Sequence, residues 1–360
     1  MPSKALRILI APTAFKGTLS PRQAAEAMAS GVRRVRPDAQ LKLLPVSDGG
    51  DGFLECLSTD AALHWRNVTG PLGAMVSAPF ALHGDGHAVI ESARCCGLTL
   101  VPPDTLDPFR ATSRGVGELL LAAGKMGAVR ASVGLGGSAT NDGAAGALQA
   151  LGFRLLDETG SELEAGGGSL RRLARVVPPE RADWPAITCA CDVENPLLGP
   201  NGCTAVYGPQ KGVHTEDQRE ALEQGLARLA SFTAFPADTP KAGAAGGLAF
   251  GLAAFADAQL VAGSDFVLSH LRFDERLREC DLLITGEGKL DGQTLQGKIV
   301  GEVIQRARRG GVGAFAICGV LGPGWEPLRE LLSGPPVETR ELQRAAQGVA
   351  DAAASLAGNW

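Results

Sequence analysis

A short apolar run that stops at a charged, glycine-rich loop constrains the fold of this chain more than any other feature. Residues 282–284 read as a buried strand that ends at Gly286, and a helical pattern begins near Ile299. Such a loop between a strand and a helix can present backbone N–H groups and a helix N-terminus to a phosphate. The predicted nucleotide- or phosphate-binding residues are Gly286, Glu287, Gly288, Gln293, Thr294 and Lys298.

Part of this loop resembles a P-loop. Residues 292–298 match its first seven places, G-x-x-x-x-G-K, but the next residue is Ile299. The Ser or Thr that would hold Mg²⁺ is therefore missing. We interpret the stretch as a phosphate-binding loop of another kind, and a purely structural loop is the alternative.

Two further β-loop-α segments open the chain. Residues 7–11 predict a strand that leads to Lys16, and residues 41–46 predict a second strand that leads to a polar glycine loop. Function is expected where the carboxyl ends of parallel strands release their loops. We predict that Lys16 is catalytic. The candidate substrate-binding residues of the second loop are Asp48, Gly49 and Gly50.

A third polar loop, residues 134–143, follows a predicted strand at 129–133 and supports two interpretations. The pattern G-x-G-x-x-A, with Asp157 further on, fits a dinucleotide fingerprint and hence an oxidoreductase built on residues 134–157. The alternative is a polar anion cradle, which the hydroxyl and amide side chains favour. A plain tight turn also stays open. The candidate substrate-binding residues of the cradle are Ser138, Thr140 and Asn141.

Carboxylates in two of the loops are candidates for binding a metal ion or transferring a proton. Asp192 follows an apolar strand predicted at 187–191, with Glu194 and Asn195 close behind, and Asp291 lies inside the phosphate loop. Oxygen ligands of this kind suit Mg²⁺ or a general base. We therefore predict that Asp192 and Asp291 are catalytic and hold the metal.

The domain organisation follows from a change of pattern along the chain. At 360 residues two domains are expected. Both ends show regular β-loop-α units, whereas the middle contains a hairpin around Asp85 and Gly86. We predict an α/β protein with a discontinuous parallel-sheet domain, residues 1–70 and 275–360, and an inserted domain with a mixed sheet, residues 71–274. The active site is expected in the interdomain cleft.

Charge and hydrophobicity argue against a nucleic-acid or membrane partner. The net charge is −5 and no Lys/Arg block stands out, which argues against a nucleic-acid partner. The longest uncharged run, residues 242–256, is too short to span a bilayer, and the amino terminus does not read as a signal peptide. We expect a cytoplasmic protein with a small-molecule substrate and no membrane contact. A homodimer is one possible oligomeric state.

Six motifs, in order along nearly the whole chain, carry a family resemblance. They are AP-x-x-FKG-x-LS (11–20), P-V-x-DGG-x-G (45–52), GLGGSATNDG (134–143), ACDVENPLLGPNG (190–202), GPQKG (208–212) and ITGEG-x-LD-x-QT-x-x-GK (284–298). Together they resemble the type I family of bacterial glycerate kinases. The resemblance implies a flavodoxin-like discontinuous domain, an inserted mixed-sheet domain and Mg-ATP as phosphoryl donor. It also implies D-glycerate as acceptor and 2-phosphoglycerate as product.

The sequence departs from the family pattern at four positions. Thr13 and Ala14 stand where Asp and Ser are usual, and Asp51 and Phe53 stand where Glu and Thr are usual. All four lie in the two amino-terminal loops, so they bear on the substrate more than on the reaction class. We expect an ATP-dependent kinase, a phosphotransferase with an alcohol group as acceptor. A kinase of another small hydroxy-acid, the dinucleotide oxidoreductase and a non-catalytic sensor of a small acid are the alternatives.

Overall fold

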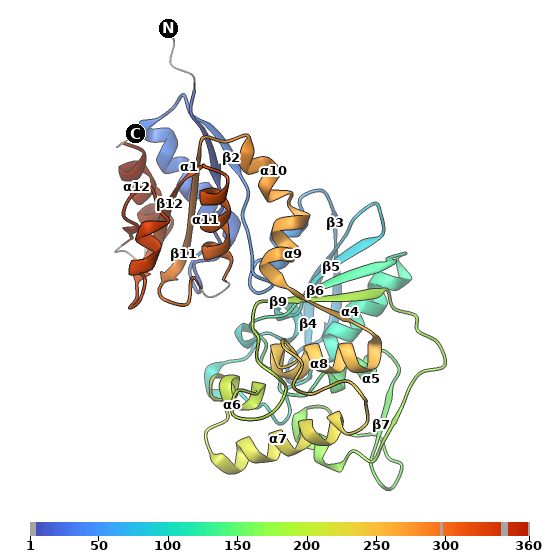
Figure 1. Cartoon of the computed structure of the whole chain (residues 1–360). Coiled ribbons are helices and arrows are strands. Elements are labelled where there is room, and N and C mark those ends of the chain that lie inside the picture. The colour runs from blue at the N-terminus through green and yellow to red at the C-terminus, as the bar shows by residue number, and fades with distance from the viewer. Residues whose placement is uncertain (1–4, 296–297, 340–344, 359–360) are drawn as a thin grey trace. The chain divides into compact units, whose positions relative to one another are not determined.

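The computed structural model describes residues 5–295, 298–339 and 345–358. The chain forms two compact units, one from Met1–Leu57 together with Gly263–Trp360 and the other from Ser58–Ala262 (Figure 1). The first unit is thus discontinuous in sequence, and the second is inserted into it. Both crossings come about a dozen residues earlier in the chain than the predicted boundaries at 70/71 and 274/275.

A five-stranded parallel sheet forms the centre of the first unit. Its strands are β1 (Arg7–Ile10), β2 (Gln40–Leu43), β11 (Leu282–Leu290), β12 (Gly313–Leu321) and β13 (Val337–Glu338). Read from one edge the order is β2-β1-β11-β12-β13. Within the unit this is the order 2-1-3-4-5 of flavodoxin-like folds. The predicted parallel-sheet domain is confirmed.

Helices cover this sheet because its strands are apolar on both faces. Ile8 and Ile284 pack in a core with residues of α1 (Pro21–Val35) and α12 (Ala345–Ala357), whereas Leu9 and Leu283, which alternate with them, are equally buried. A capping box of Ser20 and Gln23 starts α1. The other helices of the unit are α2 (Phe53–Leu57), α9 (Gly263–His270), α10 (Phe273–Arg278) and α11 (Ile299–Arg309).

Strand β11 is longer than the sequence predicted. It was expected to stop at Gly286, yet it pairs with β12 up to the partners Leu290 and Leu321. Glycines make this extension feasible, because a Cβ at Gly286 would overlap the carbonyl oxygen of Ile317, and one at Gly319 would come within 2.5 Å of the Gly288 oxygen. The predicted glycine-rich loop is therefore strand through residue 290, and the loop itself begins at Asp291.

A six-stranded mixed sheet forms the centre of the inserted unit, as predicted, in the order β10-β9-β6-β5-β4-β3. Strand β4 (Met75–Leu82) is antiparallel to both of its neighbours, β3 (Ala62–Thr69) and β5 (His87–Glu91). From β5 the sheet continues in parallel through β6 (Arg130–Gly134), β9 (Ala186–Cys191) and β10 (Gln259–Ala262). The turn at Asp85 and Gly86 joins β4 to β5, so the predicted hairpin is confirmed. A separate antiparallel pair consists of β7 (Arg154–Leu156) and β8 (Arg175–Val177).

Strand pairing and helix packing explain where the boundaries fall. Strand β3 pairs with β4 along its whole length, so residues 62–69 belong to the inserted sheet rather than to the first domain. Helix α9 packs on α2, where Phe266 stacks on Phe53 with ring centroids 6.2 Å apart. Residues from Gly263 onward therefore belong to the first unit. The pattern of residues 62–69 mixes exposed apolar and polar side chains, which hid this strand.

Helices and an apolar core complete the inserted unit. Its helices are α3 (Ala93–Cys96), α4 (Arg114–Lys125), α5 (Ala145–Ala150), α6 (Cys203–Tyr207), α7 (Glu216–Ala230) and α8 (Ala244–Ala256). Phe80, Ile90, Leu119 and Val133 are fully buried in its main core. Throughout the described part of the chain, no helix is both long and apolar enough to cross a membrane.

Helices α1 and α12 cross so closely that only glycine fits at one position, which gives a test of the fold. A Cβ at Gly31 would overlap the carbonyl oxygen of Ala350. We predict that Gly31→Ala lowers the free energy of unfolding by about 2 kcal/mol, as overpacking does. Gly310→Ala is the control, because the nearest atom to its Cβ would lie 3.3 Å away. Urea unfolding measures both, and equal stability of the two variants would contradict the close crossing.

Candidate active site

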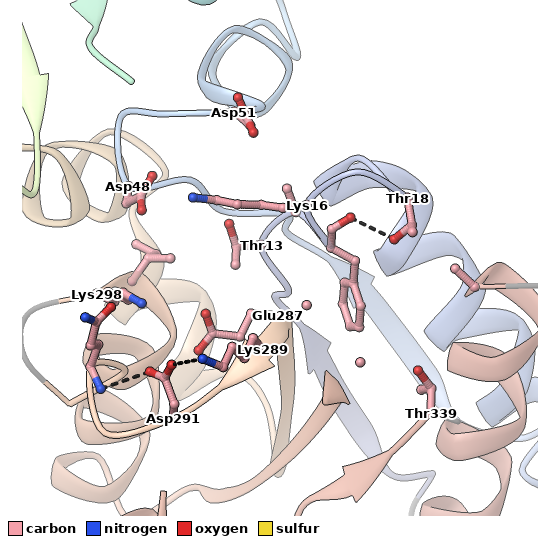
Figure 2. A pocket seen from close by; sticks show the side chains of 17 residues that line it. Thr13, Lys16, Thr18, Asp48, Asp51, Glu287, Lys289, Asp291, Lys298 and Thr339 are labelled. Atoms are coloured by element: carbon pink, nitrogen blue, oxygen red, sulfur yellow. Dashed lines mark hydrogen bonds and ion pairs between the residues drawn. The ribbon is translucent and has the colours of Figure 1, made fainter. Parts of the chain in front are cut away.

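A cavity of about 390 Å³ opens at the carboxyl ends of the strands of the first unit (Figure 2). Three segments contribute most of its lining: the loop after β1, the loop after β2, and the end of β11 with the start of α11. Three lysines line it: Lys16, Lys289 and Lys298. Four carboxylates line it as well: Asp48, Asp51, Glu287 and Asp291.

The strand order explains why a cavity forms here. Strands β1 and β11 are neighbours, and the chain moves outward from them in opposite directions, to β2 on one side and to β12 on the other. In open α/β sheets ligands bind outside the carboxyl ends of the strands at such a switch point. Segments far apart in sequence thus meet in one place. The predicted residues that line this cavity are Lys16, Asp48, Glu287, Gly288, Asp291, Gln293 and Lys298.

Lys16 lies at the tip of a tight turn. The Phe15 N–H donates to the Leu19 oxygen at 2.9 Å, and the Leu19 N–H donates back to the Phe15 oxygen at 3.0 Å. Gly17 completes the turn with φ of +78°. Lys16 is exposed and has no ion-pair or hydrogen-bond partner among the residues that the structure describes. Its side chain reaches toward Asp48 in Figure 2, so its charge is available to a ligand.

The loop after β2 is fixed by its own hydrogen bonds. Asp48 accepts the Gly50 N–H at 3.0 Å, and the buried Ser47 hydroxyl donates to the Asp51 oxygen at 3.3 Å. Gly49 adopts a φ of +95°. Gly49 and Gly50 therefore shape the turn, and they are absent from the described cavity lining, whereas the carboxylates of Asp48 and Asp51 reach it.

The extended part of β11 presents three charges on one face. Side chains two residues apart in a strand point the same way, so Glu287 and Lys289 project together, and Asp291 follows at the strand end. Lys289 Nζ lies 3.0 Å from Asp291 Oδ2, and the Gln293 N–H donates to Asp291 Oδ1 at 3.0 Å. Burial acts to raise the pKa of Asp291, but these hydrogen bonds and the charges of Lys289 and Lys298 outweigh it and hold the pKa below its usual value. Asp291 is therefore ionised at neutral pH.

Thr294 connects the two carboxylates rather than the cavity. It is fully buried; its hydroxyl donates to Glu287 Oε1 at 2.7 Å and accepts the Asp291 N–H at 3.2 Å. Gly286 is likewise enclosed in the β11–β12 pair. Of the six residues predicted to bind nucleotide or phosphate, these two are therefore placed behind the cavity wall.

The polar loop at residues 134–143 lies in the inserted unit and is used within the protein. Ser138, Thr140 and Asn141 are buried. Lys211 Nζ donates to Ser138 Oγ at 3.2 Å and to the Thr140 oxygen at 2.7 Å, and Asn141 Nδ2 donates to Thr204 Oγ1 at 3.0 Å. The side chains predicted to form an open anion cradle are thus largely engaged by protein groups.

The same loop is anchored by a buried carboxylate and by small residues. Asp142 Oδ2 accepts the Ser113 N–H at 2.8 Å and the Ser113 hydroxyl at 2.9 Å. A Cβ at Gly246 would overlap the Thr140 oxygen, and one at Gly251 would overlap the Gly143 oxygen. The small-residue stretch that starts α8 therefore lets this helix pack directly on the loop.

The dinucleotide interpretation of residues 134–157 is wrong. A dinucleotide fingerprint requires a strand-helix-strand unit whose two strands lie parallel in one sheet. Here β6 pairs with β5 and β9, while β7 pairs with β8 in a separate antiparallel sheet. Asp157, expected to bind a ribose, instead accepts the Thr159 N–H at 2.9 Å and the Ser161 N–H at 3.0 Å in its own turn.

Asp192 lies half-buried after β9 in the inserted unit, whereas Asp291 belongs to the first unit. Asn195, predicted to support Asp192, is engaged in its own loop. Its Nδ2 donates to the Asn201 oxygen at 2.8 Å and its Oδ1 accepts the Tyr207 hydroxyl at 2.7 Å. The two carboxylates predicted to share the metal therefore belong to different units.

Two lysines of interest were missed by the sequence prediction. Lys289 would have been found by continuing the strand alternation past Gly286. Lys211, which is 2% exposed, lies in the GPQKG turn, and nothing local signals that it reaches residues 138–140. Its partners are about seventy residues away in sequence, so only the fold brings them together.

The known proteins that this chain is similar to include glycerate kinases. The model of the glycerate kinase family matches residues 8–357. A glycerate kinase of Bacillus subtilis (strain 168) is 45% identical over 327 residues, covering 88% of this chain and 85% of the relative. A glycerate 2-kinase of Escherichia coli (strain K12) is 43% identical over 306 residues, covering 82% and 80%. The crystal structure of a protein from Salmonella typhimurium LT2 assigned as glycerate kinase 2 superposes with a TM-score of 0.81 at 37% identity, covering 99% of this chain and 98% of the other.

The buried Lys211 gives a pH-dependent prediction for stability. Burial lowers its pKa to about 8, although nearby Cys203, Cys96 and Asp142 act in the opposite direction. Between pH 8 and the ordinary lysine value, the unfolded chain holds this proton and the folded chain does not, so the free energy of unfolding rises with pH. At about 1.4 kcal/mol per pH unit, the gain is on the order of 3 kcal/mol.

Urea unfolding of the wild type and of Lys211→Met from pH 7.5 to 10 measures this gain. We expect the wild type to gain stability relative to the variant as the pH rises. Lys125→Met, which removes an exposed lysine of α4, is the control and should track the wild type. A difference between wild type and Lys211→Met that stays constant with pH would contradict the lowered pKa.

Proposed function

Because the chain belongs to the glycerate kinase family, we propose that it transfers the γ-phosphoryl group of ATP to a hydroxyl of D-glycerate and gives 2-phosphoglycerate. The observation that supports this most directly is the cavity at the switch point of the parallel sheet. It gathers three lysines and four carboxylates from the end of β11, the start of α11 and the loops after β1 and β2. Phosphoryl transfer requires this combination, since it depends on positioning and on charge stabilisation around the moving group.

The cationic groups of the cavity are suited to the phosphate oxygens. Lys16 extends from the turn after β1, and Lys298 is the residue that precedes the first turn of α11. The N-terminus of a helix carries partial positive charge and unpaired N–H groups that bind phosphate. Lys298 and Ile299 both line the cavity, so this helix end faces it. Lys16 and Lys298 then neutralise the charge that develops on the transferred group.

The carboxylates of the cavity fit a divalent cation. Mg²⁺ takes one or two carboxylates together with phosphates and water. Asp291 is an ionised oxygen donor in the cavity, and its ion pair with Lys289 marks the place where a cation is favoured. Asp291 is our proposed metal ligand, with Asp192 as the second, catalytic candidate. Mg²⁺ bound there would offset negative charge on the phosphate oxygens.

The small acid is proposed to be oriented by the loop after β2 and by the loop at 134–143. Asp48, Gly49 and Gly50 form the first group, and Ser138, Thr140 and Asn141 form the second. In the second group, most of the polar side-chain atoms hold the loop together. We therefore expect its contribution to come mainly through the shape of the backbone.

The alternative acceptor is a different small hydroxy-acid. Three of the four departures from the family pattern, Thr13, Ala14 and Asp51, line the cavity. The fourth, Phe53, is fully buried and packs on Phe266. The substitution at 53 is thus a matter of core packing, whereas the other three are placed to influence the acceptor.

Coupled ADP release over a panel of short hydroxy-acids tests the proposed function. We expect D-glycerate to give the highest kcat/KM and the phosphorylated product to carry phosphate on the 2-hydroxyl by ³¹P NMR. A higher kcat/KM for another acid would transfer the proposal to that acid. If folded enzyme releases no ADP with any of the acids, the proposed kinase activity is contradicted.

Removal of the Lys16 charge tests its proposed role. The residue is exposed on a turn that its neighbours hold, so Lys16→Met should keep the fold. We predict that kcat falls at least about 100-fold, as for the loss of a charge stabiliser. Lys42→Met, which removes a surface lysine of β2, is the matched control and should leave kcat unchanged. Near-normal turnover by Lys16→Met would exclude a catalytic role.

Neutralisation of Asp291 tests the metal assignment. Asp291→Asn keeps the shape of the side chain but weakens an oxygen ligand for Mg²⁺. We predict that the Mg²⁺ concentration for half-maximal rate rises about tenfold or more, the range for loss of a metal-site contact. Asp274→Asn, at a surface ion pair of α10, is the control. An unchanged Mg²⁺ titration of folded Asp291→Asn would place the ion elsewhere.

A further inference from the structure

Glu287 differs from the other carboxylates of the cavity in its surroundings. It projects from the extended part of β11 and is half-buried, and in Figure 2 it lies between Thr13 and the Lys289–Asp291 pair. Asp291 has Lys289 as an ion-pair partner, whereas Glu287 has none among the described residues. In the described part of the chain, its carboxylate accepts one hydrogen bond, from the Thr294 hydroxyl. A carboxylate that lines this cavity without an ion-pair partner calls for a specific role.

A phosphate-binding role does not suit this side chain. An ionised carboxylate accepts hydrogen bonds and cannot donate one to a phosphate oxygen. The negative charges of the two groups would also repel each other. Glu287, predicted as a nucleotide- or phosphate-binding residue, is therefore unsuited to direct contact with the phosphate oxygens. In a kinase site, a carboxylate without a lysine partner can bind the metal or accept the proton of the acceptor hydroxyl, and Asp291 is already the proposed metal ligand.

We propose that Glu287 is the general base of the reaction and that Thr294 is its positioning residue. This inference rests on the proposed kinase function. As the hydroxyl oxygen attacks the γ-phosphorus, a new P–O bond forms and the bond from phosphorus to the β–γ bridging oxygen breaks. The bridging oxygen keeps the electron pair and leaves with ADP. The hydroxyl proton passes to a carboxylate oxygen of Glu287, which later releases it to water.

The environment of Glu287 is suited to a base that must take and release a proton. Burial raises the pKa of its carboxyl, and the charges of Asp291 and Asp48 act in the same direction, while the Thr294 hydrogen bond and the charge of Lys298 oppose them. A base whose pKa lies closer to the working pH transfers protons more efficiently. The same cavity therefore holds one carboxylate kept ionised, Asp291, and one poised to accept a proton, Glu287.

Thr294 fixes Glu287 relative to the rest of the site. One hydroxyl donates to Glu287 Oε1 and accepts the Asp291 N–H, so it joins the base to the loop of the proposed metal ligand. The backbone of Thr294 is itself held, because a Cβ at Gly301 of α11 would overlap its carbonyl oxygen. Oε1 is thus directed by protein, and the remaining oxygen of Glu287 is left for the acceptor hydroxyl.

The decisive variant is Glu287→Gln, whose amide oxygen still accepts the Thr294 hydrogen bond but cannot take the proton. We expect kcat to fall about 10²- to 10⁴-fold, the usual contribution of a general base. The KM for ATP and the Mg²⁺ titration should stay near those of the wild type. Glu279→Gln, an exposed glutamate of the same unit, is the matched control and should retain wild-type kcat.

Two results would overturn the role of Glu287 without touching the kinase function. One is a kcat of Glu287→Gln close to that of the wild type. The other is recovery of the rate at high Mg²⁺, which would make Glu287 a metal ligand. If wild-type enzyme itself releases no ADP with any hydroxy-acid, the proposed function fails, and the base with it.

The positioning role of Thr294 is tested by a conservative pair. Thr294→Val removes the hydroxyl but keeps the side-chain volume, and Thr294→Ser keeps the hydroxyl. We expect Thr294→Val to lower kcat about tenfold with little change in the KM for ATP, as for loss of an interaction that matters in the transition state. Thr294→Ser should restore most of the rate. Equal loss in both variants, or a loss confined to the KM for ATP, would overturn the positioning role.

Discussion

The close pairing of β11 with β12 beyond the rest of the sheet is the constraint on which the candidate site depends. Gly286 and Gly319 allow the two backbones to approach where any Cβ would collide. Because the ladder continues to Leu290, Glu287 and Lys289 project on one face in strand geometry. The strand therefore serves as a rigid support for the charges of the cavity.

The strand order then decides what those charges meet. With β1 and β11 adjacent, the turn that carries Lys16, the loop that carries Asp48 and the start of α11 surround the end of β11. This arrangement resembles a P-loop site in its helix N-terminus and its lysine, but not in its metal ligand. Ile299 stands where a P-loop has Ser or Thr, so the metal ligand proposed here is instead the carboxylate of Asp291, which follows β11.

The sequence predicted what depends on local chemistry. Asp85 and Gly86 marked the hairpin, and the apolar runs at 7–11 and 41–46 marked strands β1 and β2. The length of β11 was not predicted, because the glycines and charged residues of GEGK are typical of loops. They form a strand here because the opposing Gly319 of β12 allows the two backbones to pair. Strand β3 was missed for a related reason: its pattern is weak, and pairing with β4 supplies the order.

The loop at 134–143 shows the limit of residue type as a guide. Hydroxyl and amide side chains at Ser138 and Asn141 indicated a ligand site, yet Lys211 and Thr204, distant in sequence, occupy them. The same polar residues would have suited an open cradle or a buried anchor equally well. Only the hydrogen-bond partners of these side chains distinguish a cradle from an anchor, and those partners depend on the complete fold.

The position of the reacting phosphate distinguishes the proposed site from any other. A crystal structure with a non-hydrolysable ATP analogue, Mg²⁺ and D-glycerate is the most direct test. We predict the γ-phosphate in the cavity of the first unit, within hydrogen-bonding reach of Lys16 and Lys298, with the metal on Asp291 and an acceptor hydroxyl facing Glu287. A γ-phosphate bound away from this cavity would contradict the account.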